Sequence, residues 1–414
     1  MSDARIVITT PTTGVPILLE APARARDRFP HDELARLVAL RRELHRHPEL
    51  SWKEYATSDR LAAVAESLGG TVQRVANTGV VARFRGRDPA APVVAVRGDI
   101  DALPIQEETG LDYASAVPGV MHACGHDVHA TWAIGAAMDL VRHPARGDVL
   151  VVLQPAEEVG AGAPAILDSG ILDHVAAIFG GHVDRRFDVG QVIAEPGPLA
   201  ASADTFAITL VGRGAHGARP HESADAVVAA AAVITALQTI VARRLDPAAP
   251  AVCTVGSVHA GVAANVIPEK ATLTGTLRAM DPVTRRRLGE EVTRLATQVG
   301  EAYGVRAEVT LELGTPPIVN PVREAGWARQ AATQVLGEDA VVPFGITNMG
   351  GEDFAFYMER IPGCFLRIGA REPGGASIAA HSPRFYAADG AIMVGAAVLA
   401  ECARVASEAL ADGR

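Results

Sequence analysis

Short apolar runs alternate with longer amphipathic segments in the first half of the chain. Leucine and valine recur with helical spacing over residues 32–47, and a second helical segment covers about residues 55–68. Beyond them the pattern predicts four short strands, at 80–84, 92–96, 149–153 and 175–179. A predicted helix that ends near residue 143 lies between the second and third of these strands. Strands that alternate with helices favour an α/β fold with a mostly parallel central sheet and flanking helices on both faces.

The pattern of apolar and polar positions changes near Ala201. The pattern there predicts, in chain order, a strand at 206–211, a helix at 224–243, strands at 251–258 and 271–278, a helix at 282–302 and a strand at 306–312. This β-α-β-β-α-β order is typical of a ferredoxin-like α+β unit. After Pro316 and Pro317 the pattern of the first part of the chain, strands that alternate with helices, resumes. We therefore predict three parts: a loosely ordered N-terminal arm at 1–30, a discontinuous domain at 31–200 and 314–414, and an inserted domain at 201–313.

The composition narrows the class of protein. Hydrophobic residues make up 49% of the chain and charged residues 21%, which is typical of a folded soluble protein. The formal net charge of -10 argues against nucleic acid or an anionic membrane as a partner. No secretory signal and no run long enough to span a bilayer stand out, and four scattered cysteines do not form a disulfide framework. We expect a cytoplasmic protein that acts on a small molecule.

Polar residues stand where the predicted strands end. The second strand leads into Asp99 and Asp101, the third into Glu157 and Glu158, and the fourth into His182. In open α/β sheets, ligands bind outside the carboxyl ends of the strands. One site can therefore collect all of these side chains.

Residues 120–129 are the densest source of ligand chemistry, with Cys124, Asp127, His122, His126 and His129. The Cys124-Gly125-His126 spacing suits a loop around a metal ion better than one face of a helix. A buried cysteine beside surface histidines is the alternative for such a pair alone. The acids at the strand ends supply further partners and favour the metal site.

Adjacent acids such as Glu157 and Glu158 are costly directly after a buried strand, unless a cation or hydrogen bonds offset their repulsion. A solvated helix start is the alternative. Two such carboxylates can divide the work, one binding metal while the other acts as a base.

Other histidines are weaker signals. His182 and His381 are each more often hydrogen-bonded residues than ligands when taken alone. His216 and His221 lie in a Gly- and Arg-containing stretch, for which a surface loop is the preferred interpretation from the residues alone.

Ordered motifs from about residue 36 to the C-terminus resemble the M20 metallopeptidase-like amidohydrolases. The branch concerned holds N-acyl-amino-acid, hippurate and indoleacetyl-amino-acid hydrolases. The motifs that carry the resemblance are Leu44-His45-Arg46-His47-Pro48-Glu49-Leu50, Arg97-Gly98-Asp99-Ile100-Asp101-Ala102-Leu103-Pro104, Met121-His122-Ala123-Cys124-Gly125-His126-Asp127, Gln154-Pro155-Ala156-Glu157-Glu158, Asn265-Val266-Ile267-Pro268, Met349-Gly350-Gly351-Glu352-Asp353-Phe354 and His381-Ser382-Pro383.

The resemblance implies two divalent metal ions per subunit, with Cys124 bridging them. The implied ligands are Cys124, His126, Glu158, His182 and His381. Glu157 would then be the general base, and Asp101 would orient a ligand from behind. Mixed sulfur, nitrogen and oxygen ligands suit Zn²⁺ or Mn²⁺, and also Co²⁺ or Ni²⁺.

The resemblance also gives the inserted domain a role as a lid and dimerisation domain, so that we expect a homodimer. His216 matches a histidine that reaches toward the scissile carbonyl, in relatives often from the neighbouring subunit, which reverses the surface-loop interpretation. Asn265 and Arg278 match positions that contact the substrate's carboxylate.

The implied reaction is hydrolysis of the amide bond of an N-acyl amino acid by water and the Glu157 base. Val159, Gly181 and Gly217 depart from residues frequent in relatives without removing a ligand. A dipeptidase, an aminopeptidase or a carbamoyl-amino-acid hydrolase is the nearest alternative. From other classes, Cys124 can be the nucleophile of a thiol amidase with His126 or His129 as its base, or the chain can be an inactive metal-binding scaffold.

Overall fold

The computed structural model describes residues 5–9 and 16–413, which divide into two compact units. Unit 1 comprises Met1–Gly197, Asn320–Gly345 and Phe356–Arg414, and unit 2 comprises Pro198–Val319 and Ile346–Ala355. Residues 314–319 and 346–355, which the sequence pattern assigned to the first domain, therefore belong to unit 2. The second of these segments joins unit 2 through backbone contacts, because the N–H of Ala201 donates to the carbonyl oxygen of Gly350 at 3.1 Å.

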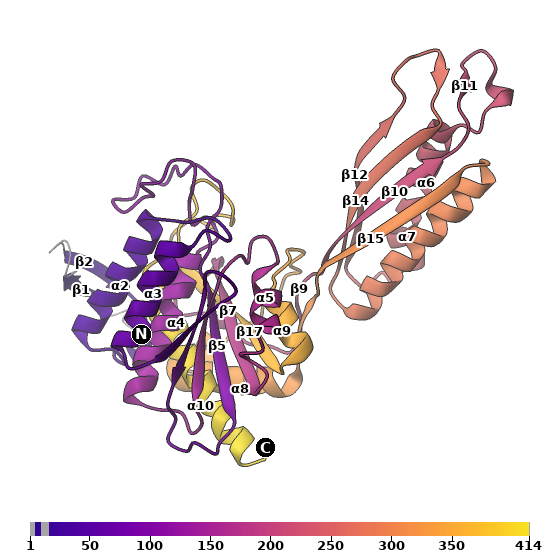
Figure 1. The fold of residues 1–414 in the computed structure, drawn as a ribbon. Helices are drawn as coiled ribbons and strands as arrows, with labels where there is room; N and C mark the ends of the chain where they lie inside the picture. Colours follow the sequence, from indigo (N-terminus) through magenta and orange to yellow (C-terminus); the bar gives the residue numbers. More distant parts are fainter. Residues whose placement is uncertain (1–4, 10–15, 414) are drawn as a thin grey trace. The chain divides into compact units, whose positions relative to one another are not determined.

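A seven-stranded sheet forms the centre of unit 1, in the order β3-β4-β6-β5-β7-β17-β8 (Figure 1). The four inner strands β6, β5, β7 and β17 are parallel, whereas β4 and β8 pair antiparallel with their neighbours. β3 pairs antiparallel with β4 and so has the direction of the inner strands. The bounds are β3 Thr71–Val75, β4 Gly79–Phe84, β5 Val93–Asp99, β6 Val149–Gln154, β7 Val175–Asp188, β8 Val192–Ile193 and β17 Gly363–Arg371. The carboxyl ends of the parallel strands consequently lie on one side of the sheet.

Strand β7 is much longer than the sequence pattern predicted. It continues through Gly180 and Gly181 to Asp188, and His182 pairs with Arg367 of β17. The expectation that His182 ends a strand is therefore wrong. The two glycines suggested a turn, but a Cβ at Gly181 would lie 3.2 Å from the carbonyl oxygen of Leu366, so that glycine relieves a close approach inside the sheet. The pairing with a strand far along the chain decides the conformation here.

Helices cover both faces of this sheet. α4 connects β5 to β6, and α5 connects β6 to β7, which lies on the other side of β5. Because crossovers between parallel strands are right-handed, these two connections, which run in opposite directions across the sheet, place α4 and α5 on opposite faces. α4 packs against β5 and against α10, where a Cβ at Gly395 would come within 2.2 Å of the Trp132 ring. The bounds are α2 His31–Arg46, α3 Tyr55–Ser67, α4 His126–Arg142, α5 Gly162–Asp168, α8 Val322–Leu336, α9 Phe354–Arg360 and α10 Gly390–Ala411.

The N-terminal segment is more structured than the loosely ordered arm that we predicted. β1 (Arg5–Thr9) pairs antiparallel with β2 (Pro16–Glu20), and the short helix α1 (Ala23–Arg26) follows. Ala25 and Phe29 are buried in the main hydrophobic core. This tertiary burial orders a segment whose composition alone suggested little structure; the parts of that prediction at residues 1–4 and 10–15 lie outside the described residues.

Within residues 5–9 and 16–413, two helices are long and apolar enough by length and composition to cross a membrane, contrary to the sequence expectation. In α10, 89% of the apolar stretch is buried inside the protein, which is the pattern of a core helix. In the other, Ala226–Arg244 of unit 2, 33% of the apolar stretch is buried. Length and composition alone are weak evidence for a membrane span.

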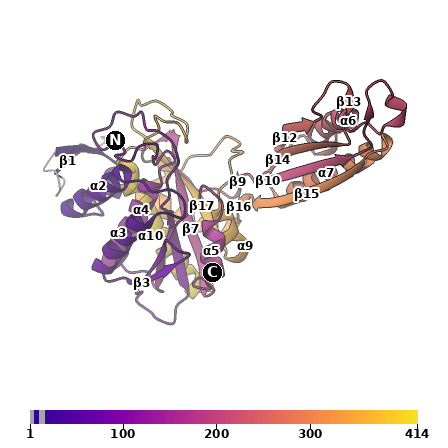
Figure 2. The ribbon, with the colours of Figure 1, turned by 45° about the horizontal axis from the view of Figure 1, so that its top comes forward.

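Unit 2 is an antiparallel four-stranded sheet with two long helices (Figure 2). The strand order β12-β14-β10-β15 and the chain order β-α-β-β-α-β are those of a ferredoxin-like unit. Phe206, Ile208 and Leu210 alternate along β10 and form a core with residues of both helices. The bounds are β10 Ala203–Val211, α6 Ala226–Thr239, β12 Ala251–Ala260, β14 Lys270–Ala279, α7 Pro282–Ala302 and β15 Arg306–Thr315.

Short elements complete the chain. They are β9 Gly197–Ala200, β11 Ala215–His216, η1 Pro220–Glu222, the π-helical turn η2 Ile240–Arg244, β13 Val266–Ile267, β16 Ile318–Asn320 and η3 Glu338–Ala340.

Candidate active site

Asp101 lies just beyond the end of β5 and is almost fully buried. Its Oδ1 lies 3.2 Å from Nδ1 of His126. Its Oδ2 accepts hydrogen bonds from the backbone N–H of Glu158 at 3.1 Å and from the hydroxyl of Ser51 at 2.7 Å. Burial alone would raise the pKa of Asp101, but the hydrogen bond and charge of His126 bring it below its usual value. Asp101 therefore orients two of the predicted metal ligands at once.

Cys124, His126 and His182 form the first group of possible ligands, with donor atoms all within 4.8 Å of one another. Gly125, at φ 90°, starts helix α4, so that Cys124 lies just before the helix and His126 at its first residue. The Cys124 Sγ lies 3.1 Å from Nε2 of His182. His182 Nδ1 donates to the carbonyl of Val183 at 2.7 Å, which leaves Nε2 as the basic nitrogen facing the sulfur.

A second group contains Cys124, Glu158 and His381. His381 Nε2 lies 3.4 Å from Oε2 of Glu158, and this hydrogen bond raises the pKa of the imidazole. The histidine has a φ of 65°, and its N–H donates to the carbonyl of Ala123 at 2.8 Å. That bond ties a loop near the C-terminus to the Cys124 segment, so the structure brings together residues more than 200 positions apart in the chain.

Glu157 completes a third group with His126 and Glu158. His126 Nε2 lies 3.8 Å from Oε2 of Glu157 and 3.7 Å from Oε1 of Glu158. The structure thus gathers all five predicted ligands and the predicted base in unit 1.

The donor set fits divalent metal ions. Among the described residues, Nε2 of His126 and Oε1 of Glu158 are buried without any hydrogen-bond partner. Unpaired buried donors and acceptors destabilise a fold unless something else binds them. Burial, and then the negative charge of Glu158, also raise the pKa of the Cys124 thiol, a shift that a bound cation would oppose. Sulfur, imidazole and carboxylate ligands together are typical of zinc and its neighbours in the first transition series.

His129 is occupied elsewhere. Its Nδ1 lies 2.6 Å from Oδ1 of Asp99, and its Nε2 accepts the backbone N–H of Val183 at 2.9 Å. Asp99 also pairs with Arg97, which is fully buried. Asp99 and His129 thereby hold the strand that carries His182, and His129 has no nitrogen left to act as the base of a Cys124 nucleophile.

Asp127 belongs to a further buried network that sequence reasoning missed. Its Oδ2 accepts from Nε of Arg41 at 2.7 Å and from Nδ1 of His45 at 2.8 Å. Although burial opposes it, the charges of Arg41 and His45 lower the pKa of the Asp127 carboxyl strongly. The motif around His45 was visible in the sequence, but its partner 82 positions later was not.

The remaining predicted residues lie in unit 2. β11 and β13 pair, and Gly217 N–H donates to the carbonyl of Asn265 at 2.7 Å, which brings His216 and Asn265 side by side. The N–H of Ala218 donates to Nδ1 of His216 at 3.0 Å, so the proton of the neutral ring resides on Nε2 and can be donated. Arg278 lies on β14 and is half-buried, and no hydrogen bond or ion pair of its guanidinium is found among the described residues.

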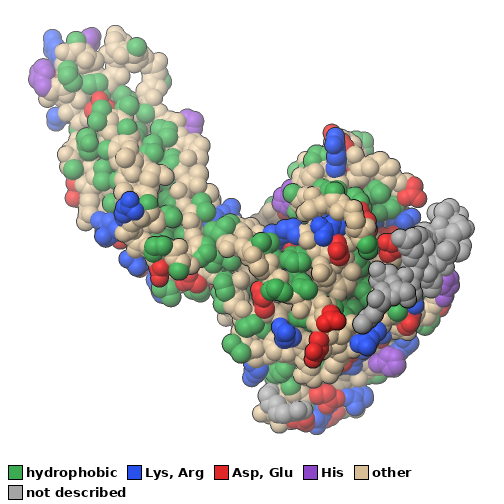
Figure 3. Space-filling view, turned by 180° about the vertical axis from the view of Figure 1, so that it is seen from behind, with side chains coloured by type: hydrophobic (Ala, Val, Ile, Leu, Met, Phe, Trp, Pro, Cys, Tyr) green, Lys and Arg blue, Asp and Glu red, His purple; other side chains and the backbone are tan. Residues whose placement is uncertain are grey.

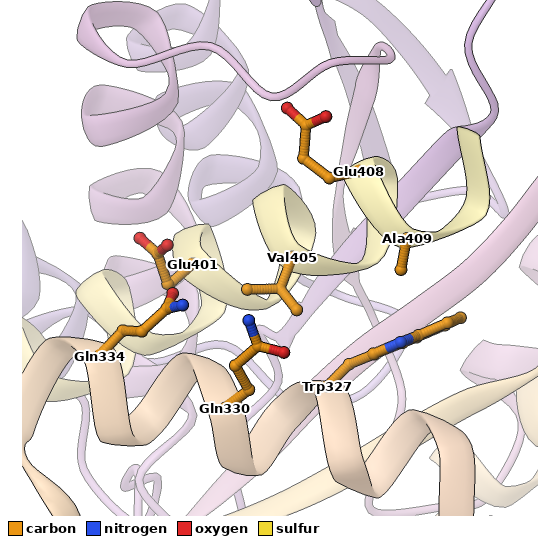
Figure 4. Close-up of a pocket in the computed structure, with 7 residues that line it drawn as sticks. All are labelled: Trp327, Gln330, Gln334, Glu401, Val405, Glu408 and Ala409. Atoms are coloured by element: carbon orange, nitrogen blue, oxygen red, sulfur yellow. The ribbon is translucent and has the colours of Figure 1, made fainter. Parts of the chain in front are cut away.

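A separate pocket lies between α8 and α10 in unit 1, with a volume of ≈ 310 Å³ (Figure 4). Its acids already have partners: Glu401 pairs with Arg28 and Arg404, each at 2.9 Å, and Glu408 pairs with Arg87. The pocket contains no histidine or cysteine, so it offers none of the chemistry of the site described above. It is lined by Trp327, Gln330, Gln334, Glu401, Val405, Glu408 and Ala409.

Cysteine, histidine and glutamate donors that meet in an α/β unit, with a second carboxylate beside them, are the arrangement of a metal-dependent hydrolase. The profile of Peptidase family M20/M25/M40 matches residues 95–405, and the chain belongs to this family. It is 39% identical over 379 residues to the N-acetylcysteine deacetylase of Bacillus subtilis, covering 91% of this chain and 98% of that one. It is 38% identical over 375 residues to the IAA-amino acid hydrolase ILR1-like 5 of Arabidopsis thaliana, covering 89% and 86%.

A solved structure supports the same family assignment. The crystal structure of the Bacillus subtilis YxeP protein, described as a dinuclear metal-binding peptidase of the M20 family, matches with a TM-score of 0.81 and 36% identity over 91% of this chain and 99% of that one. These likenesses confirm the predicted family and fold class. The protein is a metal-dependent amidohydrolase.

Proposed function

We propose that the protein hydrolyses the amide bond of N-acyl amino acids and releases a carboxylic acid and a free amino acid. The observation that carries this proposal is the position of Glu157, a carboxylate next to Glu158 in the chain, with its Oε2 3.8 Å from Nε2 of His126. The names of the two relatives, a deacetylase of N-acetylcysteine and a hydrolase of IAA-amino acids, support the substrate class.

Each residue has a role in this reaction. Two divalent ions, Zn²⁺ or Mn²⁺ in the first place, would polarise the scissile carbonyl and acidify water when held by Cys124, His126, Glu158, His182 and His381. Glu157 accepts the proton of the attacking water and returns it to the leaving nitrogen. The Nε2–H of His216 donates to the carbonyl oxygen as negative charge develops there. Arg278 pairs with the free carboxylate of the substrate, because its planar fork matches that group, and Asn265 donates to the same end.

The layout of unit 2 supports a homodimer. Asn265 and His216 are close to the start of β14, and Arg278 is eight residues further along the strand. At about 3.3 Å per residue, these groups lie on the order of 25 Å apart, too far for one small substrate to contact both. We therefore propose that His216 and Asn265 serve the site of the neighbouring subunit while Arg278 serves its own.

Exposed apolar surface on unit 2 is consistent with such a partner. Val227 and Val228 of α6 are 44% and 48% exposed, and Val258 lies on the edge strand β12. Figure 3 shows hydrophobic side chains at the surface of unit 2 on the face seen from behind. An edge strand beside an apolar helix is a common element of a twofold interface.

Mixing two inactive variants tests the dimer and the shared site together. His216→Ala and Glu157→Gln should each be nearly inactive. After subunit exchange in equal amounts, half of the dimers are mixed and each of them holds one intact site, so activity should return to about a quarter of the wild-type value. A mixture that remains as inactive as the separate variants would contradict the exchange of His216 between subunits.

A substrate panel tests the reaction itself. Protein of known metal content should release amino acid from N-acetyl and larger N-acyl amino acids at least about tenfold faster, by kcat/KM, than from dipeptides or N-carbamoyl amino acids. Methyl esters of the same N-acyl amino acids should be poor substrates because Arg278 loses its partner. Equal or greater turnover of dipeptides would favour the peptidase alternative.

The four cysteines are free, which supports the proposed cytoplasmic location.

A further inference from the structure

Glu54 is a buried carboxyl group that the proposed reaction does not use. Its side chain is inaccessible to solvent, and among the described residues no ion pair joins it to a cation. Its Oε2 accepts the hydroxyl of Thr78 at 2.6 Å and its Oε1 accepts the backbone N–H of Ala156 at 2.9 Å. Burial raises the pKa of this carboxyl in spite of these bonds. Burial of a carboxyl group is costly unless hydrogen bonds offset it, so the two groups that Glu54 binds indicate what it holds in place.

The residue that Glu54 holds has an unusual backbone. Ala156 is buried and has a φ of 51°, in the left-handed region that residues other than glycine rarely adopt. Its carbonyl oxygen accepts the N–H groups of Ala161 at 3.2 Å and Gly162 at 3.1 Å. The chain therefore folds back on itself directly after β6, and Glu157 leaves this turn in a direction that the conformation of Ala156 determines.

Two carboxylates clamp the turn, one on each side of Glu157. Glu54 binds the N–H before it, on Ala156, and Asp101 binds the N–H after it, on Glu158 at 3.1 Å. One loop supports both clamps, because Ser51 donates to Asp101 at 2.7 Å three residues before Glu54. This loop follows the His45-containing motif along the chain.

We propose that Glu54 is a positioning residue for Glu157, which it aims by holding Ala156 in the left-handed conformation. The inference rests on the proposed function, in which Glu157 is the general base. A base displaced by about 1 Å can lose on the order of 10²-fold in rate, so a clamp of this kind affects turnover more than substrate binding.

Two substitutions separate positioning from a purely structural role. Glu54→Ala removes the acceptor for Ala156 and should lower kcat by about 10- to 100-fold with KM changed by less than about threefold. Glu54→Gln keeps an acceptor oxygen for Ala156, and its amide can donate to the Thr78 hydroxyl, so its kcat should stay within about threefold of wild type. Metal content should be unchanged in both, because Glu54 touches none of the five ligands.

Glu49 provides a matched control in the same loop. Its carboxylate accepts the N–H groups of Ala56 at 3.2 Å and Thr57 at 2.8 Å but does not contact the turn. Glu49→Ala should therefore lower the melting temperature while leaving kcat within about twofold of wild type. A loss of kcat in Glu49→Ala as large as that in Glu54→Ala would overturn the proposal, since loop stability would then explain both.

A double-mutant cycle with Ala156→Gly tests the proposed cause. Glycine adopts the left-handed conformation without strain, so removal of Glu54 should reduce kcat several-fold less in the glycine background than in the wild type. Additive effects would overturn the clamp. Hydrogen exchange at the Ala156 amide should also accelerate at least about tenfold in Glu54→Ala, a readout that does not depend on the role of Glu157. Full activity in Glu157→Gln would contradict the proposed function. The exchange measurement would still show whether Glu54 holds the Ala156 amide.

Discussion

Glu157→Gln should lower kcat by about 10²-fold or more while the protein keeps its metal and its fold. Glutamine has nearly the same shape as glutamate but cannot accept and return a proton at neutral pH. The side chain faces His126 Nε2 at 3.8 Å, so an isosteric amide fits the same space. Steady-state rates with an N-acyl amino acid, together with elemental analysis of the purified variant, check this expectation.

Glu158→Gln is the matched control, because the two acids are neighbours on one turn with different partners. Glu158 approaches His381 Nε2 at 3.4 Å and shares a ligand group with Cys124 and His381. Its substitution should reduce metal content as well as rate, whereas that of Glu157 should spare the metal. Near wild-type activity in Glu157→Gln would assign the base to another group, and equal metal loss in both variants would make Glu157 a ligand.

The sequence was informative about this site where a residue's role depends on its position in a local pattern. Apolar strands that end in acids predicted that Asp101, Glu157 and Glu158 would meet, since the carboxyl ends of parallel strands share one side of a sheet. The structure places these three within hydrogen-bonding or ligand distance of His126. For His381 and His182 the residues alone were indecisive, and the family resemblance supplied the assignment.

The features that could not be predicted from the sequence are those set by contacts between segments far apart in the chain. His182 lies inside β7 because β17, nearly two hundred residues later, extends the pairing past two glycines. The hydrogen bond from Ala156 to Glu54 likewise joins positions 102 residues apart. Periodicity and propensity report on local conformation, whereas these contacts depend on how remote segments pack. The same limit explains why segment 346–355 was assigned to the wrong unit.

Removal of divalent metal should abolish turnover and lower the melting temperature, and both should recover when Zn²⁺ or Mn²⁺ is added back. Without a cation, the donor set leaves His126 Nε2 and Glu158 Oε1 buried without a hydrogen bond, and it keeps two adjacent acids close to a thiol whose pKa burial raises. A ligand that binds only the folded state stabilises it by about 2.7 kcal/mol at a hundred times its dissociation constant. Activity and thermal unfolding after dialysis against a chelator measure the two effects on one sample.

Substitution of cysteine distinguishes this metal site from a thiol amidase. Cys124→Ser should weaken metal binding, because serine is a poorer ligand than thiolate, yet excess metal should restore part of the activity. Cys364→Ser is the control, since within the described part of the chain that buried thiol donates only to the carbonyl of Phe365, and its substitution should affect stability alone. If chelation spared turnover and Cys124→Ser abolished it at every metal concentration, Cys124 would be the nucleophile. Because both nitrogens of His129 are already bonded to Asp99 and Val183, the base in that outcome would be His126 or His182, whose Nε2 lies 3.1 Å from the Cys124 sulfur.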